Sequence, residues 1–188
     1  MAVPLIAGRG RDEMRTIVIG VTGSIAAYKA CELVRLFVKN GDSVHVVMTE
    51  HATEFVTPLT FRTLSRHPVP SALFGAADEW QPGHISLAAL ADVVVVAPAT
   101  ANIIAKMAHG IADDILSSIL LATRAPIVVA PAMNAGMYEN AATQANLETL
   151  RSRGVNVVEP ASGELACGTS GMGRLAELSD ILAFAVAL

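Results

Sequence analysis

The strongest constraint on the fold is a run of four consecutive valines, Val93 to Val96, between Asp92 and Ala97. Valine is branched at Cβ and favours strands. Because strand side chains alternate between the two faces of a sheet, four apolar residues in a row predict a strand that is buried on both faces. Strands of this kind occur in parallel sheets that are covered by helices on both sides.

Other short apolar runs alternate along the chain with segments of helical periodicity. Strands are predicted at 16–22, 43–48, 92–97, 126–130 and 155–158, with a minor strand at 69–73. Helices are predicted from an N-cap at Ser24 to Asn40-Gly41, then after Pro58 and at 84–91, 103–109, 113–123, 140–153 and 178–186. This alternation predicts a single doubly wound α/β domain (Rossmann-like, flavodoxin-like), with a parallel sheet and helices on both faces.

Composition narrows the class of protein. Hydrophobic residues make up 53% of the chain and charged residues 16%, yet no run reaches the roughly 18 apolar residues of a membrane span. We therefore expect other subunits of a homo-oligomer to cover the excess apolar surface. The net charge of −4, without a basic tract, and the 4% of aromatic residues argue against nucleic acid as a partner.

The two cysteines, Cys31 and Cys167, lie far apart and indicate neither a disulfide framework nor a metal site. Residues 1–15 carry three arginines but no long apolar segment, so they are not typical of a secretory signal. We expect a disordered leader at 1–15, one domain at 16–188, and a cytoplasmic protein.

Ligands of doubly wound sheets bind beyond the C-terminal strand ends, where the strand order reverses. The turn Gly23-Ser24-Ile25 follows the first strand and could bind a phosphate at a helix N-terminus, or be an ordinary helix cap. Neither G-x-G-x-x-G nor a Walker motif is present, which disfavours a dinucleotide or ATP as the ligand. The phosphate of a mononucleotide remains possible. Thr49 begins the corresponding turn after the second strand.

The turn Pro98-Ala99-Thr100-Ala101-Asn102 follows the valine-rich strand. Its small side chains would let a flat ring approach the backbone, and Thr100 and Asn102 could donate or accept hydrogen bonds. The same residues are equally consistent with a strand-to-helix loop that caps the next helix.

His84 and Asn134 are the polar residues with the clearest chemical options. A neutral imidazole at His84 could act as a general base near pH 7, or cap a helix. Asn134 could hold a substrate carboxylate or amide, or be a turn residue, while Met133 and Met137 could be core or subunit contacts. The sequence indicates no partner for the remaining histidines, which are His45, His51, His67 and His109.

The stretch from Gly163 to Gly173 contains four glycines, which disfavour a helix and weaken a strand. We expect a flexible flap at 162–175, in which the thiol of Cys167 is accessible and can donate a proton. Cys31 is expected to be a packing residue on the first helix.

Five motifs, in this order and spacing, resemble the flavin-dependent cysteine decarboxylases over Thr16 to about Glu177. They are Gly23-Ser24-Ile25-Ala26-Ala27-Tyr28-Lys29, His84-Ile85, Ala97-Pro98-Ala99-Thr100-Ala101-Asn102, Pro131-Ala132-Met133-Asn134-Ala135-Gly136-Met137-Tyr138 and Ala166-Cys167-Gly168. Ala166-Cys167-Gly168 is typical of the coenzyme A branch, and tyrosine at position 138, where the peptide-modifying branch commonly has tryptophan, mildly favours it too.

The resemblance implies bound FMN, a homotrimer or a dodecamer built from trimers, and active sites between subunits. It implies that His84 is the base, that Asn134 positions the substrate carboxylate and amide, and that Cys167 is the acid. The cofactor residues implied are Gly23, Ser24, Ile25, Thr49, Pro98, Ala99, Thr100, Asn102 and Ala132, and the substrate residues are Asn134, Met133, Met137, Ala166 and Gly168.

The implied reaction converts 4′-phosphopantothenoylcysteine to 4′-phosphopantetheine. Oxidation of the substrate thiol to a thioaldehyde places the carboxylate β to a C=S group, so that CO₂ loss gives a delocalised ene-thiolate. Hydride return and a proton from Cys167 then complete the product. The segment Ser86 to Ala91 has no basic residue, so no side chain is assigned to the substrate phosphate.

Three alternatives stay open. The first is a decarboxylase of C-terminal cysteines in ribosomally made peptides, against which Ala166-Cys167-Gly168 argues. The second is a non-catalytic FMN-binding regulator, which would usually carry an acidic tail or lose a catalytic residue. The third is a flavin prenyltransferase, for which a basic cluster is missing. No synthetase domain follows before Leu188, so we expect a stand-alone decarboxylase or a piece of a larger protein.

Overall fold

The computed structural model describes residues 14–71, 83–164, 168 and 170–188. The predicted leader up to residue 13, the loop around Trp80 and the Ala166-Cys167 pair lie outside the described residues. The central sheet has five parallel strands in the order β2-β1-β3-β4-β5. Their bounds are β1 Thr16–Val21, β2 Ser43–Met48, β3 Val93–Ala99, β4 Ile127–Pro131 and β5 Asn156–Val157. The order reverses between β1 and β3, which confirms the predicted doubly wound fold.

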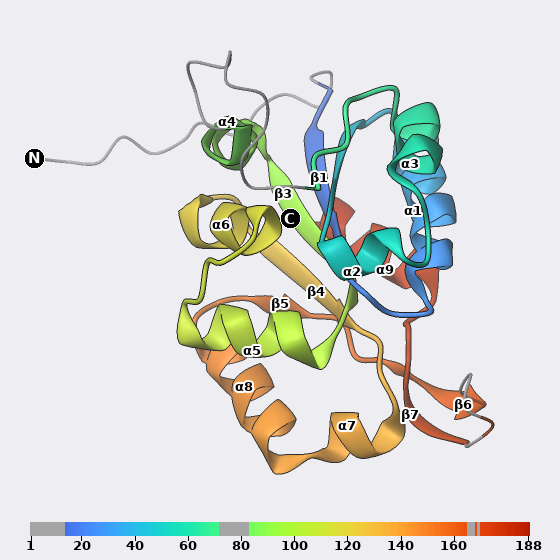
Figure 1. Ribbon diagram of the computed structural model, residues 1–188, viewed down its shortest axis with the longest axis vertical. Helices are drawn as coiled ribbons and strands as arrows, with labels where there is room; N and C mark the ends of the chain where they lie inside the picture. Colours follow the sequence, from blue (N-terminus) through green and yellow to red (C-terminus); the bar gives the residue numbers. More distant parts are fainter. Residues whose placement is uncertain (1–13, 72–82, 165–167, 169) are drawn as a thin grey trace, which may run out of the picture.

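Helices cover both faces of this sheet (Figure 1). One face carries α1 Ala27–Lys39, α3 Pro58–Ser65 and α9 Leu178–Val186, and the other carries α4 Gly83–Leu90, α5 Ala101–His109, α6 Ile115–Ala122 and α8 Ala141–Ser152. Val93 and Val95 of β3 pack into the first core, whereas Val94 and Val96 pack into the second. The valine run is apolar throughout because both of its faces are buried.

Capping side chains mark where several of the helices begin. The side chain of Asn140 accepts a hydrogen bond from the N–H of Ala142 and caps α8, as predicted. Asp114 and Ser117 form a reciprocal capping box at the start of α6. The prediction of Ser24 as the N-cap of α1 is wrong, because that helix begins at Ala27 with Ala26 as its N-cap.

The glycine-rich stretch forms an antiparallel hairpin, β6 Ala161–Glu164 with β7 Ser170–Arg174, which we call the hairpin. These residues pair as strands where the sequence predicted a loop, whereas the flexibility of the flap at 162–175 stays a prediction. β7 packs against the short helix α7 Ala135–Glu139, beside which the hairpin lies at the lower right of Figure 1. Packing against α7 supplies contacts that the glycines, which have no side chains, cannot supply themselves.

Three smaller differences concern local structure. Pro98 and Ala99 belong to β3 and are not turn residues, and two short helices, α2 Glu50–Thr53 and α7, were not predicted. Residues 69–71 of the predicted minor strand have no strand structure, although the carbonyl of Pro70 accepts a hydrogen bond from the N–H of Met48 at 3.2 Å. No helix in the described residues is both long enough and apolar enough to cross a membrane.

Candidate functional site

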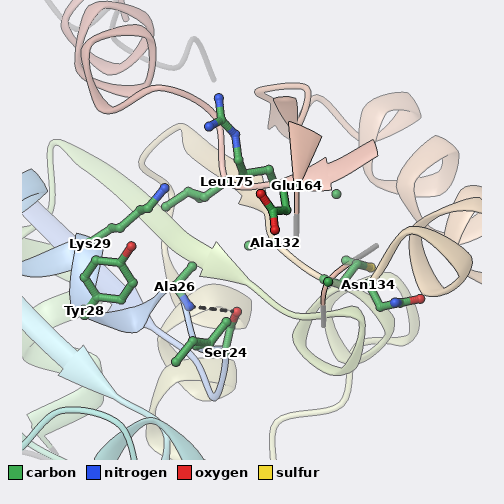
Figure 2. Close-up of a pocket in the computed structure, with 13 residues that line it drawn as sticks. Ser24, Ala26, Tyr28, Lys29, Ala132, Asn134, Glu164 and Leu175 are labelled. Atoms are coloured by element: carbon green, nitrogen blue, oxygen red, sulfur yellow. Dashed lines mark hydrogen bonds between the residues drawn. The ribbon is translucent and has the colours of Figure 1, made fainter. Parts of the chain in front are cut away.

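A cavity of about 660 Å³ lies beyond the C-terminal ends of β1 and β4 and beside the hairpin (Figure 2). We call it the strand-end cavity. The turn between β1 and α1, the segment after β4, and the hairpin with Leu175 each supply part of its wall. The lining residues are Ser24, Ile25, Ala26, Tyr28, Lys29, Ala132, Met133, Asn134, Glu164, Gly168, Gly173, Arg174 and Leu175. The cavity adjoins β1, the strand at which the order reverses, as the fold predicted.

The turn before α1 is held by its own hydrogen bonds. The Ser24 carbonyl accepts from the N–H of Ala27 at 2.8 Å, and the Ser24 hydroxyl accepts from the N–H of Ala26 at 3.3 Å, the contact that Figure 2 marks. Gly23 is not a lining residue, because it packs against α2: a Cβ there would lie 2.5 Å from Cβ of His51. Ser24 and Ile25 therefore face the cavity, and Gly23 allows the turn to form.

Thr22 is a residue that sequence analysis missed. It is buried, its hydroxyl donates to the carbonyl of Pro98 at 2.6 Å, and the same oxygen accepts from the N–H of Thr100 at 3.1 Å. The side chain thus joins the ends of β1 and β3. A hydroxyl residue at the end of an otherwise apolar strand was the available signal.

The other predicted cofactor residues lie at neighbouring strand ends without lining the strand-end cavity. Thr100 caps α5 by accepting from the N–H of Ile103 at 3.4 Å, so the capping alternative describes what its side chain does. Thr49 is the N-cap position of α2. The residues that the structure does not bring into this cavity are Gly23, Thr49, Pro98, Ala99, Thr100 and Asn102, whereas Ser24, Ile25 and Ala132 line it.

Asn134 lies between β4 and α7, on the opposite side of the cavity from Tyr28 and Lys29 in Figure 2. Its Oδ1 accepts from the N–H of Gly136 at 2.9 Å, which fixes the plane of the amide and caps α7. The N–H of the adjacent Met133 donates to the carbonyl of Gly173 at 2.9 Å. The hairpin is therefore bonded directly to the segment that carries Asn134.

The far end of α7 is anchored by Tyr138. This side chain is buried, and its hydroxyl donates to Oε2 of Glu159 at 2.7 Å. Burial, and then the hydrogen bond to Glu159, raise the pKa of Tyr138. The backbone carbonyl of Tyr138 also accepts from Nε2 of Gln144 at 2.6 Å. Asn134 thus begins a short helix that is fixed at its other end.

His84 lies in the first turn of α4, on the face of the sheet where α4 packs against α6. Its Nδ1 is buried and has no hydrogen-bond partner among the described groups. His84 does not line the strand-end cavity, so a single chain does not bring His84 and Asn134 together there. Met137 is 49% exposed and also lies outside the lining, whereas Met133 and Gly168 belong to it.

Sequence analysis assigned no role to four charged or polar residues that line the cavity, which are Tyr28, Lys29, Glu164 and Arg174. Nη2 of Arg174 lies 2.8 Å from Oε1 of Glu177 and forms an ion pair with it. Tyr28 and Lys29 stood inside the first motif, but only the folded chain places them on the cavity wall. No cluster of metal-ligating side chains occurs in the part of the chain that the structure describes.

Two further expectations concern residues away from the cavity. The sequence indicated no partner for His45 and His67, but the structure places their rings 4.0 Å apart and Nδ1 of His67 3.0 Å from the carbonyl of Val44. Burial, and then the charge of His67, lower the pKa of His45. Cys31 packs against the core, as predicted, and burial raises the pKa of its thiol.

Comparison with known proteins gives consistent matches. The family model described as Flavoprotein matches residues 6–188. The coenzyme A biosynthesis bifunctional protein CoaBC of Vibrio cholerae serotype O1 is 50% identical over 169 residues, which are 90% of this chain and 42% of that protein. The chain thus spans about two fifths of the length of the curated relatives that it matches first.

Two solved structures share the fold over nearly their whole length. One is a cysteine-to-serine mutant of PPC decarboxylase complexed with pantothenoylaminoethenethiol, with a TM-score of 0.83 and 29% identity over 93% of this chain and 98% of that chain. The other is the FMN-dependent cysteine decarboxylase SpaF, with a TM-score of 0.79 and 33% identity over 93% of this chain and 96% of that chain.

Proposed function

We propose that this chain, which belongs to the flavoprotein family, binds FMN and decarboxylates 4′-phosphopantothenoylcysteine to 4′-phosphopantetheine in coenzyme A biosynthesis. The observation that carries the proposal is the strand-end cavity, which brings Ser24, Asn134 and the hairpin together. The likeness to a PPC decarboxylase over 98% of that chain, and to CoaBC at 50% identity, supports the same activity. We propose the cytoplasm as its location.

The lining of the cavity fits FMN. The cofactor combines a flat, largely apolar ring system with a phosphate tail, and the cavity offers apolar surface from Ile25, Ala132 and Met133. Ser24 adds a hydroxyl beside the N-terminus of α1, a helix of 13 residues whose positive end favours an anion. The cofactor contacts predicted for Gly23, Thr49, Pro98, Ala99, Thr100 and Asn102 stay predictions.

Bound FMN would supply two-electron oxidation and reduction at the cysteine side chain of the substrate, which makes loss of CO₂ feasible. Asn134 holds the substrate carboxylate and amide from a fixed position, because its own amide is oriented by Gly136. His84 takes a proton as the general base, and Cys167 returns one as the acid. The flap at 162–175, which includes most of the hairpin, encloses the substrate and excludes water.

His84 has to come from a neighbouring copy of the chain if it acts on the same substrate as Asn134. The helices that carry and flank His84 expose large apolar side chains, with Ile85 at 46%, Leu90 at 50% and Leu121 at 63% exposure. A subunit contact would cover these side chains. We therefore propose a homotrimer, or a dodecamer built from trimers, in which α4 of one subunit completes the site of the next.

The test is mass spectrometry of the FMN-loaded protein incubated with 4′-phosphopantothenoylcysteine and, separately, with a peptide that ends in cysteine. Formation of 4′-phosphopantetheine with the peptide unchanged is the expected result. Conversion of the peptide alone would move the protein to peptide modification. If FMN binds and neither compound reacts, a non-catalytic flavoprotein becomes the better description.

Asn134→Asp separates substrate binding from helix capping, because aspartate keeps the capping oxygen but loses the amide donors. We expect the variant to fold and keep FMN, and kcat/KM to fall roughly 100-fold or more because a carboxylate now faces the substrate carboxylate. The matched control is Asn140→Asp, since Asn140 caps α8 through an equivalent 2.9 Å bond and does not line the cavity. Equal activity of the two variants would contradict the role of Asn134.

The two proposed proton-transfer residues have separate signatures. Cys167→Ser should release CO₂ but accumulate the oxidised, decarboxylated substrate, and full phosphopantetheine formation by this variant would contradict its role as the acid. His84→Asn should bind FMN, keep the assembly and release no CO₂. If size-exclusion chromatography shows instead that this variant falls apart, His84 is a structural residue of α4.

A further inference from the structure

The short helix α7, which begins after Asn134, is fixed at its other end by Glu159. α7 has five residues, far fewer than a helix needs to be stable by itself, so its position depends on what holds its ends. Its buried residue is Tyr138, which belongs to the same core as Leu147 and Leu150 of α8. The Tyr138 hydroxyl donates to Oε2 of Glu159 at 2.7 Å. A buried ring whose hydroxyl is bonded to a charged group fixes both the place and the rotation of the helix.

Glu159 is suited to be an anchor because its own position is held. The preceding residue, Val158, donates its N–H to the carbonyl of Val129 in β4 at 2.9 Å, so Glu159 directly follows a residue that is bonded to the central sheet. Oε1 of Glu159 accepts from Nη2 of Arg151 on α8, which pairs the two charges. The carboxylate thus uses one oxygen for Arg151 and the other for Tyr138, and two partners on different oxygens restrict its rotation.

The same residue stands at the root of the hairpin. The buried Pro160 is all that separates Glu159 from the start of β6. The other strand, β7, reaches the beginning of α7 through the 2.9 Å bond from the N–H of Met133 to the carbonyl of Gly173. Figure 1 shows α7 between α8 and the hairpin, which agrees with these contacts. Both ends of α7, and Asn134 with them, are therefore tied to the two sides of the hairpin.

The link from Glu159 to Asn134 is continuous. The N–H of Tyr138 donates to the carbonyl of Asn134 at 3.0 Å, and the carbonyl of Tyr138 accepts from Nε2 of Gln144 at 2.6 Å. A rotation of Tyr138 would carry the backbone of Asn134 with it. The amide of Asn134 is oriented on the same turn by the N–H of Gly136. Because misplacing a substrate-holding group by about 1 Å can lower a rate about 100-fold, the anchor of α7 affects the reaction.

We propose that Glu159 is a positioning residue, which sets the orientation of Asn134 through the hydroxyl of Tyr138 and keeps Asn134 in register with the hairpin. The inference rests on the proposed function, in which Asn134 holds the substrate. Glu159 does not line the strand-end cavity, so in this role it acts through α7.

Two single variants remove the bond from opposite sides. Tyr138→Phe keeps the buried ring and loses the hydroxyl, and Glu159→Leu keeps a side chain of similar size and loses the acceptor. We expect each to retain FMN and to lower kcat/KM for 4′-phosphopantothenoylcysteine roughly 10-fold, the loss expected for one hydrogen bond to a charged group. The double variant should fall no further, and Glu159→Gln, which keeps an acceptor oxygen, should retain most of the activity. Wild-type activity in Tyr138→Phe, or additive losses in the double variant, would overturn the proposal.

A double-mutant cycle with Asn134→Asp shows whether the effect passes through Asn134. Once the Asn134 amide is replaced, its orientation no longer matters, so the loss caused by Tyr138→Phe should shrink from roughly 10-fold to below about twofold. A loss of equal size in both backgrounds would mean that Tyr138 acts independently of Asn134. That result contradicts the proposal, because a purely structural contribution would be independent in this way.

The matched control is Arg153→Met. Arg153 donates from Nη1 to the carbonyl of Ala108 at 2.8 Å, and so joins the end of α8 to α5 rather than to α7. This variant should keep the wild-type kcat/KM. Arg151→Met, which frees one oxygen of Glu159, should lower kcat/KM by less than Glu159→Leu does. If Arg153→Met loses as much activity as Tyr138→Phe, general loosening of this helix layer explains the result and the proposal is wrong.

Hydrogen exchange gives a readout that does not depend on turnover. Mass spectrometry of peptides that cover α7 should show faster amide exchange in Tyr138→Phe and Glu159→Leu, while exchange in α6 stays at the wild-type rate. Unchanged exchange in α7 would overturn the proposal. If wild type does not convert 4′-phosphopantothenoylcysteine, the proposed function fails, and the exchange rates then decide by themselves whether Glu159 anchors α7.

Discussion

Gly173→Ala tests whether close docking of the hairpin organises the site. Gly173 has a φ of 134°, a conformation that residues with a side chain rarely adopt, and a Cβ there would lie 2.3 Å from the carbonyl oxygen of Met133. The obstacle is backbone, so it cannot rotate away as a flexible side chain would. The added methyl group should push β7 off the segment that carries Met133 and Asn134.

The expected cost follows from two contributions. Forcing alanine into such a conformation costs about 1–3 kcal/mol. Separation of β7 from Met133 also removes the 2.9 Å hydrogen bond between the N–H of Met133 and the carbonyl of Gly173, worth about 1 kcal/mol. Together they predict a loss of about 2–4 kcal/mol in the free energy of unfolding.

Gly41→Ala is the matched control, because Gly41 also has a positive φ, 93°, but no atom within 4 Å of its Cβ position. It measures backbone strain without a clash. Urea unfolding of both variants gives the comparison, and turnover of 4′-phosphopantothenoylcysteine reports on the site. If Gly173→Ala loses no more stability than Gly41→Ala and keeps wild-type turnover, the argument that this contact holds the hairpin is refuted.

Three further predictions concern stability. Leu116→Ala should cost about 2–5 kcal/mol in urea unfolding, because Leu116 is fully buried and fills the space beside Gly20; a cost under about 1 kcal/mol would contradict this packing. Burial alone would raise the pKa of Asp114, but hydrogen bonds from Lys106 and Ser117 outweigh it and lower that pKa, so the stability Asp114 contributes is present at neutral pH and lost as the pH falls below its ordinary 3.8. Asp114→Ala should therefore be less stable than wild type by about 1–2 kcal/mol at pH 7, with the difference shrinking in acid, and a pH-independent difference would argue against it. The lowered pKa of His45 means that the unfolded chain binds a proton more readily, so wild type should lose stability as the pH falls below 6.5, and His45→Gln should show a shallower slope in thermal melts between pH 7.5 and 5.

Much of the fold could be predicted because its signals are local. The four valines of β3 alternate between two buried cores, as an apolar run of that length requires. The bounds of β2 and α9 agree with the prediction, and Asn140 caps α8 as expected, since the cap and its partner are two residues apart. Spacing and side-chain chemistry within a few residues determine features of this kind.

The site was predicted only in part. Ser24, Ile25, Ala132, Met133, Asn134 and Gly168 line one cavity, while their contacts with cofactor and substrate stay predictions. His84 does not join them within one chain, and Thr100 uses its hydroxyl to cap α5. A motif identifies a residue type at a strand end, but the direction in which its side chain points depends on the element that follows.

The sequence by itself determined the parallel sheet and its helices, and it placed polar residues at the strand ends that border the cavity, because periodicity and capping act between near neighbours. Only the tertiary structure decided that the glycine-rich stretch pairs as a hairpin, and that Lys29 faces the same cavity as Asn134. These features depend on contacts such as Met133 with Gly173, between residues far apart in the chain. A local pattern does not encode such contacts, since their energy exists only once the elements have packed.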